Sequence, residues 1–340
     1  MTSPDLLSDV PEDRREQVRA ALMAALEGAA VESLAPVAGG ASGALTYRVE
    51  ADGRAYLLRL ETQRDFFRDP VRNYACMQTA AAAGVAPPVR YADPAAGVAL
   101  MDFIVQRPLT EHPGGTAGIV RDLGHFIGTL QRTDAFPQLA DYLDIVGGML
   151  NMVRGSPLFA PGLLEPHAAG FERLRAAYPW DPAAHVSSHN DPNPRNIMYD
   201  GERLWLVDWE TAFRNDRYAD IAIVANEFAT EPALEDALLT AWLGHAPDEI
   251  ARARLTLMRQ LTHLYYAGLI LTQFAAVPRE RPDDLSAPSL EAFLQAIRSG
   301  EIKPSASEGL YTMGKITLAD YLQRLESPAL LDALRVLEAK

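Results

Sequence analysis

The stretch HNDPNPRN, residues 189–196, places two prolines, three asparagines and one aspartate in a single loop. It is followed by LWLVDWE, residues 204–210, in which two further acids come directly after an apolar run. Prolines stiffen a loop, whereas aspartate and asparagine side chains supply oxygen atoms that bind cations or accept protons. The pattern therefore indicates a rigid polar loop next to a pair of buried strands.

Asp200 and Gly201 stand between two apolar runs and form a dipeptide typical of a two-residue hairpin turn. The flanking strands fold back on each other, so the end that carries Asn196 is expected to meet the end that carries Asp208. Asp191 lies in the loop just before that meeting point. Three oxygen-bearing side chains are thus predicted to converge at the mouth of one hairpin.

This set of side chains matches the requirements of phosphoryl transfer. Mg²⁺ prefers carboxylate and amide oxygens, so Asn196 and Asp208 are the predicted metal ligands. Asp191 is the predicted catalytic base, because it precedes Asn196 with the D-x-x-x-x-N spacing of kinase catalytic loops.

Other interpretations of the loop stay open. Asp191, Asn193 and Asn196 can instead cap turns around the two prolines, as short polar side chains commonly do. His189 is expected to fix the loop by hydrogen bonds rather than to catalyse. Asn193 and Glu210 are further candidates, for positioning the loop and for contact with metal or substrate.

The amino-terminal part of the chain predicts a small antiparallel sheet with one main helix. Asp52-Gly53 is a hairpin signal, and Asp69-Pro70 and Gly84 mark the start and the end of a helix. The expected elements are a leading helix (11–26), a strand pair (46–50 and 55–60), a helix (70–83) and two further strands (87–93 and 97–104).

The remainder of the chain has mainly helical spacing of its apolar residues. Helices are expected over 116–133, within 232–277, and over 285–299 and 317–337. The hairpin around Asp200-Gly201 is the only obvious strand pair of this half. The fold class is therefore predicted as α+β.

The sequence SHNDPNPRNIMYDGERLWLVDWETA resembles the aminoglycoside phosphotransferase and choline kinase superfamily of eukaryotic-like kinases, and the HND and DWE spelling is most similar to choline/ethanolamine kinases. In that family an acid at the position of Asp220 steadies the catalytic loop. The resemblance covers roughly residues 37–273. It implies an ATP-dependent kinase that uses Mg²⁺ and transfers the γ-phosphoryl group to an alcohol.

The resemblance also implies a protein-kinase-like, two-lobed fold. Residues 1–104 would form an amino-terminal nucleotide-binding lobe, with its leading helix at 11–26. Residues 105–340 would form a larger, mostly helical carboxyl-terminal lobe that carries the catalytic loop and the substrate site.

The turn GGASG, residues 39–43, precedes the first strand of the amino-terminal hairpin. Small residues let backbone amides approach phosphate oxygens, so Gly40, Ser42 and Gly43 are predicted to bind the nucleotide. Turns of this composition also serve only to link strands.

Folding the hairpin at its turn sets Arg59 opposite Thr46, where the family carries a lysine or arginine that binds ATP phosphates. An ordinary exposed strand arginine is the alternative. The family normally pairs this cation with a glutamate on the following helix, whereas no acid occurs from residue 70 to residue 90. The corresponding position falls on Asn73, which is expected to give Arg59 one neutral hydrogen bond. Either bound ATP supplies the missing charge, or the chain is a degenerate, nucleotide-binding pseudokinase with a regulatory or scaffolding role.

The adenine pocket is expected at the connector around Asp102 and Phe103. Substrate contacts are predicted for aromatic and acidic residues, which suit a cationic head group: Trp209, Glu210, Tyr265 and Tyr266. Core packing is the alternative for the aromatic residues. Related sequences that resemble choline kinases often carry tryptophan about where Leu269 stands, so an aminoglycoside antibiotic or another amino alcohol or aminosugar remains an alternative to choline.

The composition limits the partners. Lysine and arginine total 31 against 45 aspartates and glutamates, a net charge of −14 that disfavours nucleic acid and anionic membranes and mildly favours a cationic small molecule. Cys76 is the only cysteine, so no intrachain disulfide can form, and a reducing cytoplasm is expected. No secretion signal or membrane span is indicated, and homodimerisation is left open.

Overall fold

The computed structural model describes residues 4–37, 43–278, 280–303 and 306–339. The chain divides into two compact units. The first comprises Met1–Leu139, His185–Asp220 and Glu227–His245, and the second comprises Ala140–Ala184, Ile221–Asn226 and Ala246–Lys340. The amino-terminal sheet and the loop HNDPNPRN therefore belong to the same unit. The predicted boundary between residues 104 and 105 separates a nucleotide-binding lobe from a lobe with the catalytic loop and the substrate site, and this division stays a prediction.

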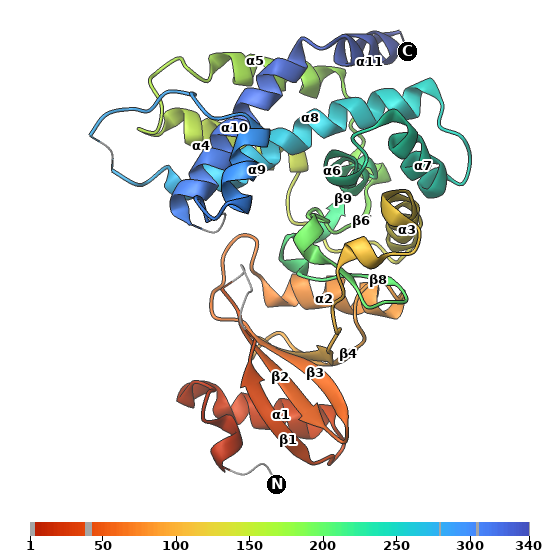
Figure 1. The fold of residues 1–340 in the computed structure, drawn as a ribbon, viewed down its shortest axis with the longest axis vertical. Coiled ribbons are helices and arrows are strands. Elements are labelled where there is room, and N and C mark those ends of the chain that lie inside the picture. The colour runs from red at the N-terminus through yellow and green to blue at the C-terminus, as the bar shows by residue number, and fades with distance from the viewer. Residues whose placement is uncertain (1–3, 38–42, 279, 304–305, 340) are drawn as a thin grey trace. The chain divides into compact units, whose positions relative to one another are not determined.

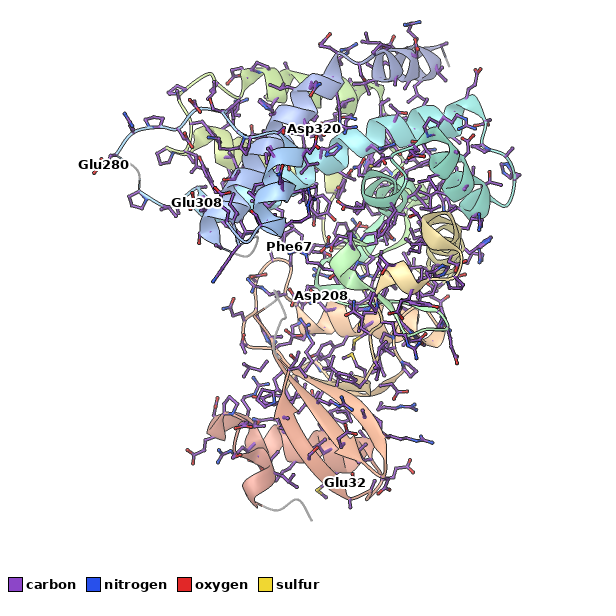
Figure 2. The ribbon with its side chains drawn as sticks, in the orientation of Figure 1. Glu32, Phe67, Asp208, Glu280, Glu308 and Asp320 are labelled. Atoms are coloured by element: carbon purple, nitrogen blue, oxygen red, sulfur yellow. The ribbon has the colours of Figure 1, made fainter. Side chains whose placement is uncertain are left out.

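The first unit contains a five-stranded antiparallel sheet with the strand order β1-β2-β3-β5-β4 (Figure 1). The strands are β1 (Val31–Pro36), β2 (Leu45–Ala51), β3 (Arg54–Leu60), β4 (Val89–Asp93) and β5 (Val98–Asp102). Four of them were predicted and are confirmed, whereas β1 was missed. Only Leu34 of β1 is buried, and its one charged residue, Glu32 (Figure 2), is exposed, as is typical of an edge strand. Its sequence therefore lacks the alternation by which strands are recognised.

The β2–β3 hairpin has the predicted turn and register. Asp52 and Gly53 both have positive φ angles, 50° and 68°, as a type I′ turn requires. Thr46 pairs with Arg59, as predicted. Position 59 is thereby fixed by local sequence.

Helix α1 (Arg15–Ala25) lies against β4 and β5, and its apolar side chains cover one face of the sheet. The shared core includes Val18, Ala21, Leu22, Tyr47, Val49, Leu58, Leu60, Val98 and Leu100. The predicted leading helix is confirmed, although residues 12–14 form a 3₁₀ turn before it. Since strand residues alternate between faces, Leu57 and Arg59 point to the opposite face.

Helix α2 (Pro70–Ala82) begins and ends as predicted. The Asp69 side chain accepts a hydrogen bond from the Val71 amide, and Pro70 occupies the first turn. Gly84 follows the helix with a φ of 72°. The helix therefore has a fixed start directly after the loop that leaves β3.

Two short strand pairs complete the first unit. The predicted hairpin is formed by β7 (Ile197–Tyr199) and β8 (Leu204–Leu206). A second pair, β6 (Val186–Ser188) with β9 (Phe213–Asn215), was not predicted, because three-residue strands carry too little pattern. Helices α3 (Gly115–Leu130) and α7 (Pro232–Leu243) pack together in the same unit.

The described part of the second unit is mainly helical, and α8 (Glu249–Leu271) contacts α4, α5, α10 and α11. Its helices also include α4 (Tyr142–Gly155), α5 (Glu165–Ala177), α9 (Leu290–Arg298), α10 (Ser307–Leu325) and α11 (Pro328–Glu338), and α6 (Tyr218–Phe228) has residues in both units. The single helix predicted over 317–337 was wrong. Ser327 caps a new helix and Pro328 cannot continue the old one, so the chain breaks there.

Short 3₁₀ helices lie at Pro4–Leu7, Glu12–Arg14, Leu109–Glu111, Pro182–Ala184, Pro194–Asn196, Trp209–Thr211 and Thr272–Phe274. The predicted α+β class is confirmed by the antiparallel sheet and the predominantly helical remainder. Among the residues that the structure describes, no helix has the length and apolar character needed to cross a bilayer.

Candidate active site

The predicted catalytic loop holds the Asp191 carboxylate between two asparagines. Asn193 Nδ2 donates to Asp191 Oδ1 at 2.7 Å, and Asn196 Nδ2 donates to Asp191 Oδ2 at 3.0 Å. Asn196 Nδ2 also lies 2.9 Å from the Asp191 carbonyl oxygen. Asn193 caps the short helix that follows, accepting from the Arg195 amide. The capping interpretation is therefore correct for Asn193, while Asp191 has both carboxylate oxygens held in fixed directions.

Asp220 of α6 anchors the amino-terminal end of the loop. Its two carboxylate oxygens accept hydrogen bonds from the backbone amides of His189, at 2.9 Å, and Asn190, at 2.7 Å. Burial raises the pKa of Asp220 to about 6, and the hydrogen bonds from the two amides oppose this increase. Asp220 therefore holds the catalytic loop by two hydrogen bonds, as expected.

Asn190 adopts a φ of 63° and is fully buried. Its Oδ1 accepts from Ser188 Oγ and Asn215 Nδ2, and its Nδ2 donates to the Phe213 carbonyl. Asparagine tolerates this left-handed conformation better than most residues. The bend that precedes Asp191 is therefore fixed by a fully bonded side chain.

His189 has the structural role that was predicted. Its Nε2 lies 3.0 Å from the Val207 carbonyl oxygen and therefore donates, and its ring packs edge-on against Trp209. Burial lowers the pKa of His189 to about 4, against the opposing effect of the hydrogen bond to Val207, so the ring is neutral at physiological pH.

The two ends of the β7–β8 hairpin meet as predicted. The Val207 amide donates to the Asn196 carbonyl at 3.0 Å, which places Asp208 beside Asn196. Asp208 has a φ of 66° and a ψ of 73°, a left-handed conformation that is uncommon outside glycine. Its buried Oδ1 accepts no hydrogen bond from the described residues. A buried carboxylate oxygen with no hydrogen bond from the described residues suits a cation.

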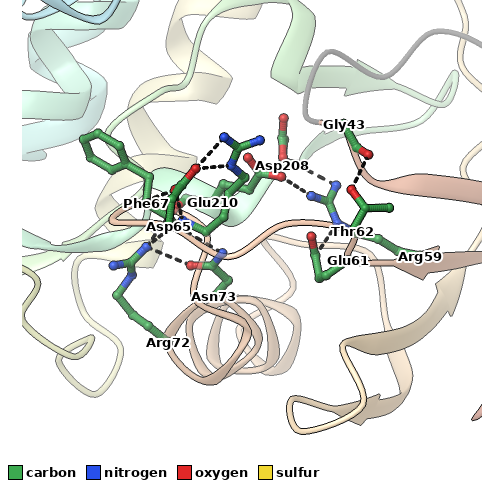
Figure 3. A network of polar contacts seen from close by, with 11 residues as sticks. Gly43, Arg59, Glu61, Thr62, Asp65, Phe67, Arg72, Asn73, Asp208 and Glu210 are labelled. Atoms are coloured by element: carbon green, nitrogen blue, oxygen red, sulfur yellow. Dashed lines mark hydrogen bonds and ion pairs between the residues drawn. The ribbon is translucent and has the colours of Figure 1, made fainter.

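Arg59 is surrounded by three carboxylates (Figure 3). Its Nε donates to Glu61 Oε1 at 2.7 Å, its Nη2 pairs with Glu210, and its Nη1 lies 3.5 Å from Asp208 Oδ1. Burial alone would lower the pKa of Arg59, but the charges of Asp208, Glu61 and Glu210 outweigh it and raise the pKa above its usual value. The alternative of an ordinary exposed strand arginine is wrong.

Asn73 does not contribute the expected hydrogen bond to Arg59. Its Oδ1 accepts from Arg72 Nη2 at 2.9 Å and its Nδ2 lies 3.4 Å from the Phe67 carbonyl. Arg72 Nη2 also donates to the Glu210 carbonyl at 2.8 Å. Arg72, the neighbour of Asn73 on the helix, therefore donates to the side-chain oxygen of Asn73 and to the backbone of the DWE segment.

The Glu210 carboxylate is unusually basic for an acid. Burial raises its pKa to about 7, the charges of Asp208 and Glu61 add to the increase, and Arg59 and Arg68 oppose it. Burial also raises the pKa of Asp208, against the charge of Arg59. The site therefore holds more negative charge than its one central arginine balances.

A cavity of about 510 Å³ lies within the first unit and gathers most of the predicted site residues. Its lining includes Arg59, Asp102, Phe103, Asp191, Asn196, Asp208, Trp209 and Glu210. Gly40 and Ser42 lie outside the described residues. The Gly43 carbonyl accepts from Thr62 Oγ1 at 2.8 Å, and its nucleotide role stays a prediction.

The connector after β5 lines the same cavity, but the backbone amides of Asp102 and Phe103 are already used. They donate to the carbonyls of Pro88 and Ala55 at 2.9 and 3.1 Å, and the Asp102 carboxylate forms two bonds with Arg90. The next residue, Ile104, also lines the cavity, and its amide has no protein partner among the described residues. Within the predicted connector, residues 100–104, Ile104 therefore presents an amide without a hydrogen bond to the described residues, and the nucleotide roles of Asp102 and Phe103 stay predictions.

Tyr265 and Tyr266 belong to the second unit. Tyr265 is fully buried and packs against Tyr142 and Tyr266, with ring centroids 5.2 and 5.6 Å away. Trp209, in the first unit, is 5% exposed and lies between His189 and Phe136. This packing fits core positions, and the substrate roles of the three aromatic residues stay predictions.

Residues 33–256 match the model of a family described as the phosphotransferase enzyme family. The chain belongs to that family. The predictions of the family and of phosphotransferase activity are confirmed by this match.

Solved structures show the same fold. The chain is similar to a choline/ethanolamine kinase family protein from Mesorhizobium loti (20% identity, TM-score 0.67), over 96% of this chain and 100% of that one. It is also similar to the choline kinase LicA from Streptococcus pneumoniae (14%, TM-score 0.63, 91% and 100%), which has also been solved with AMP. The macrolide 2'-phosphotransferase MphH from Brachybacterium faecium follows with 20% identity, a TM-score of 0.53, and coverage of 80% and 100%. These likenesses confirm the predicted kinase-like fold.

A curated relative, an uncharacterised protein from Metamycoplasma hominis, is 30% identical over 92 residues. The match covers 27% of this chain and 18% of that protein's length. It therefore adds nothing on activity.

Sequence reasoning missed two residues of the site. Glu61 follows Arg59 by two positions, which places both side chains on one face of a strand, and this spacing was a usable signal. Arg72 gave no such signal, because its partner Glu210 lies 138 residues away along the chain.

Proposed function

We propose that this phosphotransferase is an ATP-dependent kinase that transfers the γ-phosphoryl group to a hydroxyl of an amino alcohol, similar to choline or ethanolamine, or of an aminosugar. One observation carries the proposal. The oriented carboxylate of Asp191, the amide of Asn196, the carboxylate of Asp208 and the guanidinium of Arg59 line a single cavity. Phosphoryl transfer requires a proton acceptor, oxygen ligands for a metal and a cation on the phosphates, and these residues supply all three.

Asp208 and Asn196 fit a Mg²⁺ site. Asp208 Oδ1 is buried, accepts no hydrogen bond from the described residues and lies 3.5 Å from Arg59 Nη1. Asn196 turns its Nδ2 toward Asp191, so that its Oδ1 accepts no hydrogen bond from the described residues. A carboxylate and an amide oxygen are suitable ligands for this hard cation. When bound, the metal would neutralise charge on the phosphates. Glu210 is a further candidate ligand or substrate contact.

Arg59 and the connector would hold the nucleotide. The guanidinium has two Nη groups on the side of Glu210 and Asp208, and these can turn to phosphate oxygens. The amide of Ile104 would bond the base. The complex of LicA with AMP supports nucleotide use on this fold. Gly40, Ser42 and Gly43 remain proposed contacts of the phosphates.

Asp191 would receive the proton of the attacking hydroxyl. As the acceptor oxygen forms its bond to the γ-phosphorus, the bond between that phosphorus and the ADP oxygen breaks and the hydroxyl proton passes to the carboxylate. Asn193 and Asn196 hold both carboxylate oxygens in place, so little reorganisation is needed in the transition state.

A cationic acceptor fits the charges of the chain and the site. The net charge is −14, and Glu210 brings a carboxylate to the cavity that an ammonium group would contact. Trp209 lines the same cavity and is the proposed aromatic contact. Leu269 replaces the tryptophan expected of choline-specific relatives, so we include aminosugars and aminoglycoside antibiotics in the substrate class.

The test is a screen of acceptors with Mg·ATP, in which ADP release and the phosphorylated product are both measured. The panel contains choline, ethanolamine, other amino alcohols, aminosugars, aminoglycosides and a macrolide, with neutral sugars as matched controls. We expect turnover with at least one amine-bearing alcohol and little with its neutral counterpart. A pseudokinase would bind Mg·ATP and phosphorylate none of them. The pairing of Arg59 with Glu61 and Glu210 argues against that rival, because the missing helix acid leaves no uncompensated charge.

A further inference from the structure

Arg59 lacks the helix carboxylate that its position calls for, since no acid occurs between residues 70 and 90. We propose that Glu61, the residue directly after β3, positions Arg59 for the nucleotide. The proposal rests on the proposed function, because positioning matters only where Arg59 binds phosphate.

The geometry of β3 places the two side chains together. Leu57, Arg59 and Glu61 alternate with Leu58 and Leu60, so the first three line the cavity while the other two pack under α1. Glu61 Oε1 accepts from Arg59 Nε at 2.7 Å. Because Glu61 occupies the Nε edge of the guanidinium, both Nη groups remain on the side that faces Glu210 and Asp208.

Glu61 is itself held rigidly. Its side chain is only 5% exposed. Its backbone amide donates to the Gly97 carbonyl at 2.9 Å, and its own carbonyl accepts from Arg14 Nη1 at 2.9 Å. A Cβ at position 97 would lie 3.2 Å from the Glu61 Cβ, so a glycine there keeps the space open. Glu61 can therefore hold the Arg59 guanidinium in one orientation.

The other two carboxylates are less suited to this role. Asp208 lies 3.5 Å from Arg59 Nη1 and is the proposed metal ligand. Glu210 pairs with the same Nη face of the guanidinium that a phosphate would use. Both contacts compete with Mg·ATP, whereas the contact with Glu61 persists when the nucleotide binds.

Helix α2 has the neutral Asn73 where the kinase pattern has an acid, and the cation Arg72 stands next to it. Arg72 donates to the Glu210 carbonyl and to Asn73 Oδ1, as Figure 3 shows. The helix therefore positions the DWE segment, and the counter-charge of Arg59 comes from Glu61, directly after the strand that carries Arg59.

The experiment compares Glu61→Gln and Glu61→Asp with the wild type. The first removes the charge and keeps the shape, while the second keeps the charge and shortens the reach. The chain offers a matched control: Arg48 and Glu50 form the same Arg-x-Glu contact on β2, with Nε and Oε1 2.7 Å apart. Glu50 lies nearer the Asp52-Gly53 turn, outside the described residues that line the cavity.

Three quantities are measured. Calorimetry gives the Mg·ATP affinity, steady-state kinetics separates KM for ATP from kcat, and ¹⁵N NMR of the nucleotide-free protein follows the Arg59 Nε–H signal, assigned with Arg59→Lys. We expect Glu61→Gln to weaken Mg·ATP binding at least about tenfold, since hydrogen bonds between charged groups contribute on this scale. KM should rise more than kcat falls, and Glu61→Asp should lie between Glu61→Gln and the wild type.

The Arg59 Nε–H signal should be protected from exchange in the wild type and in Glu50→Gln and lose this protection in Glu61→Gln. Equal Mg·ATP affinity and an unchanged signal in Glu61→Gln would overturn the inference, as would an equal loss in Glu50→Gln. A wild-type protein that binds no Mg·ATP would refute the proposed function instead. The Arg59 signal needs no nucleotide and would then separately support or refute the Glu61 contact.

Discussion

One oxygen of the Asp220 carboxylate accepts a hydrogen bond from the backbone amide of Asn190 at 2.7 Å, and the other accepts one from the amide of His189. One buried acid on a helix thereby fixes two consecutive peptide groups directly before Asp191. This arrangement ties the orientation of the proposed base to a residue that touches no substrate.

Asp220→Asn should loosen this anchor. The amide offers one acceptor oxygen and sets an NH₂ group against a backbone N–H, so one hydrogen bond is lost and a buried donor is left unpaired. We expect a loss of roughly 1–3 kcal/mol in the free energy of unfolding, together with a lower kcat. Urea unfolding and steady-state kinetics measure both. Asp248→Asn is the control, because its carboxylate only caps α8 and asparagine caps equally well. Unchanged kcat in Asp220→Asn would show that the anchor is not needed.

Asp191→Asn should abolish turnover while leaving nucleotide binding intact. The substitution removes the proton acceptor but keeps an oxygen in place, and general-base catalysis typically contributes roughly 10²–10⁴ in rate. Single-turnover kinetics and calorimetry with Mg·ATP check the two halves of the statement. The exposed Asp134→Asn in the same unit serves as the control. Full activity in Asp191→Asn would remove this residue from the proposed mechanism.

Metal removal should weaken ATP binding far more than AMP binding. Five acids line the cavity against two arginines, Arg59 and Arg195, so the unneutralised triphosphate of ATP meets net negative charge. The acids are Glu61, Asp102, Asp191, Asp208 and Glu210. We expect at least about a tenfold loss of ATP affinity when EDTA replaces Mg²⁺, equivalent to about 1.4 kcal/mol. AMP lacks the β- and γ-phosphates and should change little. Titrations of both nucleotides with and without metal test this, and equal losses for the two would contradict it.

His167 should make the protein acid-sensitive. It is fully buried, and its Nε2 donates to the Leu318 carbonyl at 3.2 Å. Burial lowers the pKa of His167 to about 4, against the opposing effect of that hydrogen bond. Because the folded pKa lies below the unfolded value of about 6.5, the stability contribution is present above pH 6.5 and is lost as the pH falls toward 4. The full loss is about 3 kcal/mol.

His167→Gln keeps a donor for Leu318 but cannot take up a proton. We expect its free energy of unfolding to fall less than that of the wild type between pH 6.5 and 4, by up to about 3 kcal/mol. Denaturant unfolding across this range measures the difference. The exposed His125→Gln should retain the wild-type pH dependence. A wild-type slope in His167→Gln would show that other groups control acid unfolding.

Local patterns in the sequence predicted much of the fold. The DG turns, the Asp69 cap and the alternation of apolar residues fixed the hairpins and α2, because the forces that determine these features act over a few residues. The same local signals missed β1, β6 and β9, whose hydrogen bonds depend on partner strands and whose own side chains carry little pattern. They also joined α10 and α11, where a Ser-Pro pair starts a new helix.

For the site, the sequence by itself determined which residues converge at the hairpin mouth, since hairpin register brings Asn196 to Asp208 without help from the rest of the chain. Only the tertiary structure decided the electrostatics. Arg59 meets Glu210 across 151 residues, and no local pattern encodes that contact. Burial then sets the strength of these interactions. A charged group that the fold removes from water loses its hydration and depends on nearby opposite charges, and only the complete fold determines how much water is excluded.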